Sequence, residues 1–245
     1  MINSLSMHGP KILLAAAALA AVSVGVEPAS AQTAGVGKLF TSRGTCSASV
    51  ISGKNIIVTA AHCCYDRSNK QWVGGWSFAP AYNNGNTPYG MFPWSSARVL
   101  TSWVTNGGRA RDVCLISLKN NSAGRPITYY TGWYGRAWNF SPRQNMRSFG
   151  YPGNLANGQV LQQCVAPSSQ QGSGCGGDKV VKMACNMTGG SSGGPWFRDF
   201  GTGNHVNSVV SGWDGERCTG GRGKLFNGPR FTSLNIERLC RDEGC

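Results

Sequence analysis

The chain contains three histidines, and one of them, His62, closely follows the short apolar run Ile56–Thr59, which is typical of a β-strand. An imidazole can accept and return a proton near neutral pH, as a general base must. A general base also has to be held in one orientation, and a disulfide at the next residue, Cys63, would do this. Cys46 lies upstream in a strand-like segment and is the natural partner. We predict His62 as a general base beside a Cys46–Cys63 disulfide, although an isolated histidine is more often structural.

A candidate nucleophile, Ser192, lies in the glycine-rich segment Gly189–Pro195. A nucleophilic serine needs close approach of the substrate and backbone N–H groups that point at the developing oxyanion. Glycines on both sides permit unusual dihedral angles and remove side-chain obstruction. The alternative is a flexible Gly/Ser loop with no chemistry.

A candidate acid, Asp112, directly precedes the apolar run Val113–Leu118. A carboxylate beside a histidine holds the neutral tautomer and stabilises the imidazolium that forms during proton transfer. A single carboxylate at the start of a strand can instead be a cap or a turn residue. The chain has few acidic residues, and no other directly precedes so apolar a strand.

The order of these residues separates two classes of hydrolase. Gly190–Gly194 also matches the G-x-S-x-G elbow of α/β-hydrolases, in which the acid and then the histidine follow the serine. After Ser192 only His205 remains, with Asp199 between them, and this leaves almost no room for the elements that separate those residues in that class. The order histidine, acid, serine is that of the chymotrypsin class.

The composition favours a β-rich framework for these residues. The chain has 245 residues, 35 glycines and only 13% charged residues, which suits many short strands joined by tight turns. Segments such as Asn83–Asn86 and Gly201–Asn204 have turn chemistry. Leu234–Arg241 is a weak helix candidate. The length fits one large all-β domain or two small ones.

The first 31 residues have the features of a removable secretory signal. Lys11 precedes an apolar run from Ile12 to about Val26, and the small residues Ala29–Ala31 form a cleavage pattern. The run is shorter than the roughly 20 residues of a membrane span, so an uncleaved anchor is the less favoured alternative. We expect a secreted, extracellular protein that has no membrane contact after cleavage.

The ten cysteines all follow this leader, and an even number in an exported protein predicts disulfides. Zinc binding is the alternative. His62, Cys63 and Cys64 are adjacent and cannot easily face one ion together. We expect no metal and no cofactor.

The formal net charge is +13, and the basic residues are scattered singly. Without a basic run or an arginine-rich helix, nucleic-acid binding is not supported. We expect polypeptide substrates and a monomer. A basic extracellular binding protein without catalytic activity is the alternative from another functional class.

Several segments together resemble the trypsin-like serine peptidases, and look closest to their secreted glutamyl-endopeptidase-like branch in bacteria and fungi. The segments that carry the resemblance are Val36–Phe40, Cys46–Ile51, Ile57–Cys63, Trp76–Tyr82, Pro88–Gly90, Asp112–Leu115, Phe149–Pro152 and Thr188–Pro195. The similarity implies an all-β fold of two antiparallel six-stranded Greek-key barrels with a short C-terminal helix. It implies a first barrel over residues 32–130, with His62 and Asp112, and a second over residues 131–245, with Ser192.

The same resemblance implies roles for further residues. The backbone N–H groups of Gly190 and Ser192 would form the oxyanion hole. A second disulfide would join Cys164 and Cys185, while the pairing of the remaining cysteines stays open. The specificity pocket would be lined by Asn186, Ser211, Gly212 and Trp213.

The chain departs at three positions from the families that it resembles. Asn186 stands where trypsin relatives carry the aspartate that selects Arg or Lys, so this preference is not supported. Ser191 replaces the aspartate that pairs with a newly cut N-terminus, which argues against trypsin-style zymogen activation. No histidine precedes Trp213 as it does in glutamyl endopeptidases. The preferred substrate residue therefore stays open.

Overall fold

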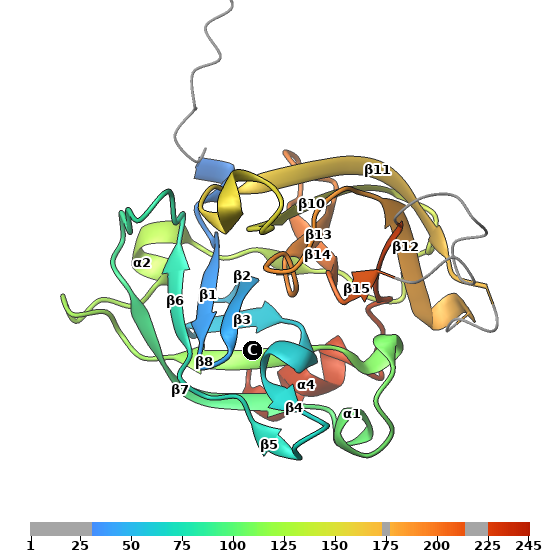
Figure 1. Ribbon diagram of the computed structural model, residues 1–245, viewed down its shortest axis with the longest axis horizontal. Helices are drawn as coiled ribbons and strands as arrows, with labels where there is room; N and C mark the ends of the chain where they lie inside the picture. Colours follow the sequence, from blue (N-terminus) through green and yellow to red (C-terminus); the bar gives the residue numbers. More distant parts are fainter. Residues whose placement is uncertain (1–30, 173–176, 214–224) are drawn as a thin grey trace, which may run out of the picture.

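The computed structural model describes residues 31–172, 177–213 and 225–245 (Figure 1). The predicted secretory signal, apart from Ala31, lies outside these residues, as do Cys175 and Cys218. Within the described ranges no helix has both the length and the apolar character needed to cross a membrane.

The first half of the chain forms a closed six-stranded antiparallel barrel. Around the barrel the strands follow the order β1 (Val36–Thr41), β2 (Gly44–Ser52), β3 (Ile56–Thr59), β8 (Cys114–Leu118), β7 (Phe92–Val99) and β6 (Ser77–Pro80). All four residues of β3 are buried, and this strand pairs with β2 and β8. The apolar run before His62 is therefore a buried strand, and the predicted strand is confirmed.

The second half forms an eight-stranded, curved sheet that lies beside the barrel (Figure 1). Its order is β15 (Gly212–Trp213), β16 (Leu225–Pro229), β12 (Val180–Ala184), β11 (Gln162–Gln170), β10 (Asn145–Gly150), β13 (Pro195–Arg198), β14 (His205–Val209) and β9 (Gly135–Arg136). All neighbours are antiparallel except the parallel pair β14 and β9. The all-β class is therefore confirmed. The second unit differs in detail from a six-stranded barrel, because two-residue strands extend its sheet at both edges.

Short elements connect the strands. They are η1 (Ala31–Thr33), η2 (Ala61–Cys63), β4 (Tyr65–Asp66), β5 (Gln71–Trp72), α1 (Thr101–Asn106), η3 (Arg109–Arg111), α2 (Thr128–Thr131), η4 (Ala156–Gly158) and η6 (Gly177–Lys179). β4 and β5 pair with each other in a small separate ribbon. Two of these elements, η2 and η3, lead into the candidate site.

The predicted C-terminal helix is present as α4 (Ile236–Glu243), two residues further along than expected. The Asn235 side chain caps it by accepting a hydrogen bond from the Ile236 N–H group at 2.6 Å. At the other end Glu243 accepts hydrogen bonds from Ser96 and Arg98 of β7 and from Ser117 of β8. The helix is thereby fixed to the outside of the barrel.

Candidate active site

Strand pairing in the barrel brings His62 and Asp112 together. Thr59, the last residue of β3, lies opposite Cys114, the first residue of the antiparallel strand β8. The chain just after Thr59 therefore runs beside the chain just before Cys114. The backbone N–H of His62 donates to Asp112 Oδ1 at 2.9 Å, and His62 Nδ1 lies 2.8 Å from Asp112 Oδ2. Fifty residues of sequence separate two side chains that are in direct contact.

Asp112 is completely buried and is held by three donors. Besides the two groups of His62, the Ser211 hydroxyl donates to its Oδ2 at 2.5 Å. Burial raises the pKa of a carboxyl group, but the charge of His62 and these hydrogen bonds outweigh burial, and the pKa of Asp112 lies below 3.8. Asp112 is therefore a carboxylate at neutral pH and only accepts hydrogen bonds.

This fixes the tautomer of His62. Because Asp112 only accepts, His62 Nδ1 carries the proton and Nε2 has a free lone pair. Burial lowers the pKa of His62, but the charge and hydrogen bond of Asp112 outweigh it, and the net pKa lies above 6.5. The charge of Arg109 opposes this rise. The side chain is 36% exposed, so part of the ring is accessible to a reacting group.

Ser192 sits in a tight turn just before β13. The Ser192 carbonyl accepts a hydrogen bond from the Ser47 N–H of β2 at 2.7 Å, which ties the turn to the first barrel. Gly193 has φ +81°, and a Cβ atom there would lie 1.9 Å from Thr59 Oγ1. Only glycine allows the turn to approach the end of β3 this closely.

The turn also orients two backbone N–H groups. The Gly189 carbonyl accepts from Gly153 N at 2.8 Å, and in a trans peptide the Gly190 N–H must point the opposite way. Within the described part of the chain, neither the Gly190 nor the Ser192 N–H donates a hydrogen bond. Gly190 has φ +96°, and a Cβ there would lie 2.4 Å from the Tyr151 carbonyl oxygen. Two unpaired donors beside Ser192 suit stabilisation of an oxyanion.

Ser47 fixes the position of this turn through two hydrogen bonds. The sequence did not indicate this residue. Its hydroxyl donates to the Gly190 carbonyl at 2.9 Å and accepts from the Tyr151 N–H at 2.9 Å. Ser47 is fully buried in β2, next to Cys46. Several serines occur in β2, so nothing in the sequence distinguishes Ser47, and its partners are more than 100 residues away.

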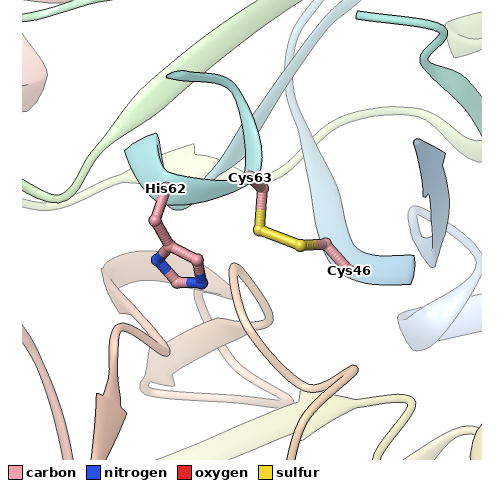
Figure 2. A group of neighbouring side chains, drawn as sticks. All are labelled: Cys46, His62 and Cys63. Atoms are coloured by element: carbon pink, nitrogen blue, oxygen red, sulfur yellow. A yellow bond between two sulfur atoms is a disulfide. The ribbon is translucent and has the colours of Figure 1, made fainter. Parts of the chain in front are cut away.

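His62 and Ser192 both line a cavity of about 470 Å³. The Cys46–Cys63 disulfide forms another part of its wall. Figure 2 shows the His62 ring beside this disulfide. Cys46, His62 and Cys63 offer three potential ligand atoms within 4.8 Å, but the two sulfurs are bonded to each other and are not available as thiolates. The cluster therefore does not suit a metal ion.

Four disulfides join described residues. They are Cys46–Cys63, Cys64–Cys114, Cys164–Cys185 and Cys240–Cys245. Cys63 and Cys64 directly follow His62, and their disulfides join the turn that carries His62 to β2 and to the start of β8. The sequence had left the second and fourth pairings open.

Comparisons with known proteins show the family to which the chain belongs. The family model described as Trypsin matches residues 23–227. This chain belongs to the trypsin family. A glutamyl endopeptidase of Bacillus licheniformis is 27% identical over 163 residues, which are 65% of this chain and 47% of that protein. The chain thus spans about half the length of this curated relative.

Solved structures of serine proteases are similar across the fold. The protease Anisep of Arthrobacter nicotinovorans is 27% identical with a TM-score of 0.76, covering 86% of this chain and 95% of its own. The thermostable serine protease AL20 from an extremophilic microorganism is 29% identical with a TM-score of 0.76, covering 87% and 99%. A Glu endopeptidase in complex with MPD, 15% identical with a TM-score of 0.73 over 87% and 92% of the two chains, shares the fold.

The residues predicted to line the specificity pocket differ from one another in how far they are exposed. The Ser211 side chain is buried and hydrogen-bonded to Asp112, while Asn186 and Trp213 are exposed. Gly212 and Trp213 form the edge strand β15, and the neighbouring residues 214–224 lie outside the described ranges. The hydroxyl of Ser211 thus supports the acid.

Arg109, which the sequence did not indicate, connects η3 to this edge strand. Its Nη1 donates to the Ser211 carbonyl at 2.9 Å, and its Nη2 lies 3.4 Å from the Trp213 carbonyl. Arg109 is only three residues before Asp112, so it ties the acid-bearing segment to the second sheet. No local motif marks such a residue.

The rival pair Asp199 and His205 lies elsewhere. His205 Nδ1 is 3.1 Å from Asp199 Oδ2, in the turn between β13 and β14. Neither residue lines the cavity that His62 and Ser192 share. The observed all-β fold also excludes the α/β-hydrolase architecture that this rival order requires.

Proposed function

We propose that the chain is a secreted serine endopeptidase with His62, Asp112 and Ser192 as its catalytic triad. The observation that carries the proposal is the hydrogen-bonded pair of His62 and buried Asp112, which leaves His62 Nε2 free at a cavity that Ser192 also lines. Membership of the trypsin family supports the same function.

In the proposed mechanism, Ser192 Oγ attacks the carbonyl carbon of a peptide bond while His62 Nε2 accepts the hydroxyl proton. The imidazolium is stabilised by Asp112. His62 then protonates the leaving amine, and an acyl-enzyme remains on Ser192. A water molecule repeats the attack, with His62 again accepting and returning the proton.

The proposed oxyanion hole consists of the Gly190 and Ser192 N–H groups. Both are free of other partners among the described residues and lie on a turn anchored by Ser47. Removing one donor from such a site costs about 3 kcal/mol of transition-state stabilisation. Their preorganisation is therefore a major part of the proposed rate enhancement.

We further propose that Asn186, Ser211, Gly212 and Trp213 border the acyl-side specificity pocket. Asn186 carries no charge to select Arg or Lys. Cleavage of a peptide library would identify the preferred residue, and a strong preference for Arg or Lys would contradict this part of the proposal.

The remaining proposals concern the mature protein. We propose cleavage after Ala31, export, and a monomer organised as residues 32–130 and 131–245. Polypeptides are the proposed substrates, and we propose no role for nucleic acid or for a membrane after cleavage. The four disulfides among described residues suit an oxidising compartment.

The test combines active-site labelling with proteolysis. The secreted protein is treated with a fluorophosphonate probe and incubated with casein, in parallel with Ser192→Ala and with Ser95→Ala, an exposed serine of β7. We expect labelling and proteolysis in the wild type and in Ser95→Ala and neither in Ser192→Ala. A folded wild type that neither labels nor cleaves would support the silent binding protein. Labelling and ester turnover without proteolysis would support an esterase.

A further inference from the structure

The cavity at His62 and Ser192 is lined mainly by residues of the first barrel, and its wall contains more basic than acidic side chains. Its charged wall residues are His62, when protonated, and Arg43, Asp66 and Arg67. We propose that this cavity selects substrates with an acidic side chain among the first residues after the scissile bond. The inference rests on the proposed peptidase function and names the class of substrate.

The position of the cavity indicates which part of a substrate it receives. Apart from Ser192, every wall residue belongs to the first barrel or its connections, and none of Asn186, Ser211 or Trp213 is among them. His62 returns its proton to the leaving amine, so this amine must lie next to His62. A cavity that begins at His62 and lies away from β15 therefore receives the leaving part of the substrate.

The one carboxylate that the described residues contribute to the wall of this cavity, Asp66, already accepts hydrogen bonds from neighbouring residues. Asp66 Oδ1 accepts from the N–H groups of Ser68 at 2.9 Å and Asn69 at 3.4 Å, and its Oδ2 accepts from the Asn69 amide at 2.7 Å. Arg43 Nη1 also donates to Oδ2. Asp66 thus has donors on both oxygens and is a poor partner for a substrate cation.

The positive charge of Arg67 is not neutralised. Its Nε and Nη2 lie 3.4 Å and 3.3 Å from the carbonyl oxygens of Val104 and Thr105, and its guanidinium lies 5.8 Å from the centre of the Trp103 ring. These partners are neutral and hold the side chain in place. Within the described part of the chain, Arg67 forms no salt bridge.

The described part of the cavity wall therefore carries two guanidinium groups and one carboxylate. His62 adds a positive charge in the tetrahedral intermediate, before it protonates the leaving amine. An acidic side chain is attracted to this wall, and a lysine or arginine is repelled. Because the cavity is open to solvent, a single charge pair should change kcat/KM by up to about fivefold. The Asp/Lys comparison combines one attraction with one repulsion, so the expected discrimination is about three- to tenfold.

The experiment uses amidated, internally quenched peptides with one acyl-side sequence taken from sites mapped in casein. Asp and Lys are compared at each of the three positions after the scissile bond, and the Asp/Lys ratio of kcat/KM is measured. We expect a ratio of about three to ten at one or more positions at low salt. The ratio should decline towards one at 0.5 M salt, where the screening length shrinks to about 4 Å.

Variants locate the source of the preference. Arg67→Gln should reduce the Asp/Lys ratio to about one to two, and Arg67→Lys should retain most of it. The matched control is Arg125→Gln, which removes an arginine that stacks on Tyr129 outside the cavity and should leave the ratio unchanged. Should Arg67→Gln fail to fold, the salt dependence of the wild type still decides the matter.

A p-nitrophenyl ester, which has no residues after the scissile bond, distinguishes the two levels of the proposal. Suppose that the wild type hydrolyses both the ester and the peptides, but the Asp/Lys ratio of kcat/KM is near one at all three positions. This result overturns the inference about acidic substrates and leaves the proposed peptidase function standing. An unchanged ratio in Arg67→Gln also overturns this inference. A wild type that hydrolyses neither substrate overturns the proposed function and this inference together.

Discussion

The Ser47 hydroxyl provides a sharp test of how the oxyanion turn is held. Ser47→Ala removes two hydrogen bonds of 2.9 Å and leaves the Gly190 carbonyl and the Tyr151 N–H without this partner. Each buried polar group left unsatisfied costs about 1–3 kcal/mol, so the expected loss in the free energy of unfolding for the two groups is about 2–6 kcal/mol. For a chain of this size the melting temperature should fall by about 4–24 °C.

The same strand supplies a matched control. Ser49 is as completely buried as Ser47, but its hydroxyl has no hydrogen-bond partner among the described residues. Ser49→Ala should therefore change the free energy of unfolding by less than about 0.5 kcal/mol, or increase it slightly. Both variants remove one oxygen atom at full burial, so their difference isolates the hydrogen bonds.

The assay is guanidinium unfolding followed by tryptophan fluorescence, with disulfides intact and in a Ser192→Ala background that prevents self-digestion. In the active background, Ser47→Ala should also lower kcat by about tenfold, less than the 100-fold or greater loss expected when an oxyanion donor is removed outright. Equal stabilities of the Ser47→Ala and Ser49→Ala variants, within about 0.5 kcal/mol, would refute this reasoning.

Three further predictions concern acid–base behaviour and packing. Because the pKa of His62 is raised and catalysis needs neutral imidazole, kcat/KM should fall as pH drops through a value above 6.5, and Asp112→Asn should lower that value. Glu243→Gln should cost about 1–3 kcal/mol at pH 7, measured by denaturant unfolding. Gly193→Ala should abolish peptidase activity, because a Cβ would lie 1.9 Å from Thr59 Oγ1.

The pH dependence of the stability difference between the wild type and Glu243→Gln provides a control for this prediction. Burial raises the pKa of Glu243, but hydrogen bonds from Ser117, Arg98 and Ser96 outweigh it, so the folded-state pKa lies below 4.5. The stability from this carboxylate is present above pH 4.5 and disappears as pH falls through the folded-state pKa. The wild type and Glu243→Gln should therefore converge in strong acid, and a constant difference down to pH 2 would contradict the assignment.

The sequence indicated His62, Asp112 and Ser192 as candidates because the patterns around them are local. They are an apolar strand followed closely by a histidine, an aspartate before another apolar strand, and a serine among glycines. The structure places His62 against Asp112 through the pairing of Thr59 with Cys114. The two-residue strands at the edges of the second sheet could not be predicted, because two residues carry no periodicity.

Residues that act across the two halves of the molecule were also beyond sequence reasoning. The resemblance assigned Ser211 to the specificity pocket, and gave no indication that its hydroxyl donates to Asp112, 99 residues away. Arg109 and Ser47 likewise bind partners that only the approach of the two sheets supplies. The Cys64–Cys114 disulfide follows from the register of β3 and β8, which an unaligned sequence does not fix.

The most direct test of the central claim is a crystal structure of the protein after reaction with a fluorophosphonate. The account predicts phosphorus bonded to Ser192 Oγ, with the phosphonyl oxygen about 2.7–3.1 Å from both the Gly190 and Ser192 nitrogens and His62 Nε2 facing the adduct. An adduct on another residue, or a phosphonyl oxygen directed away from these two N–H groups, would contradict it.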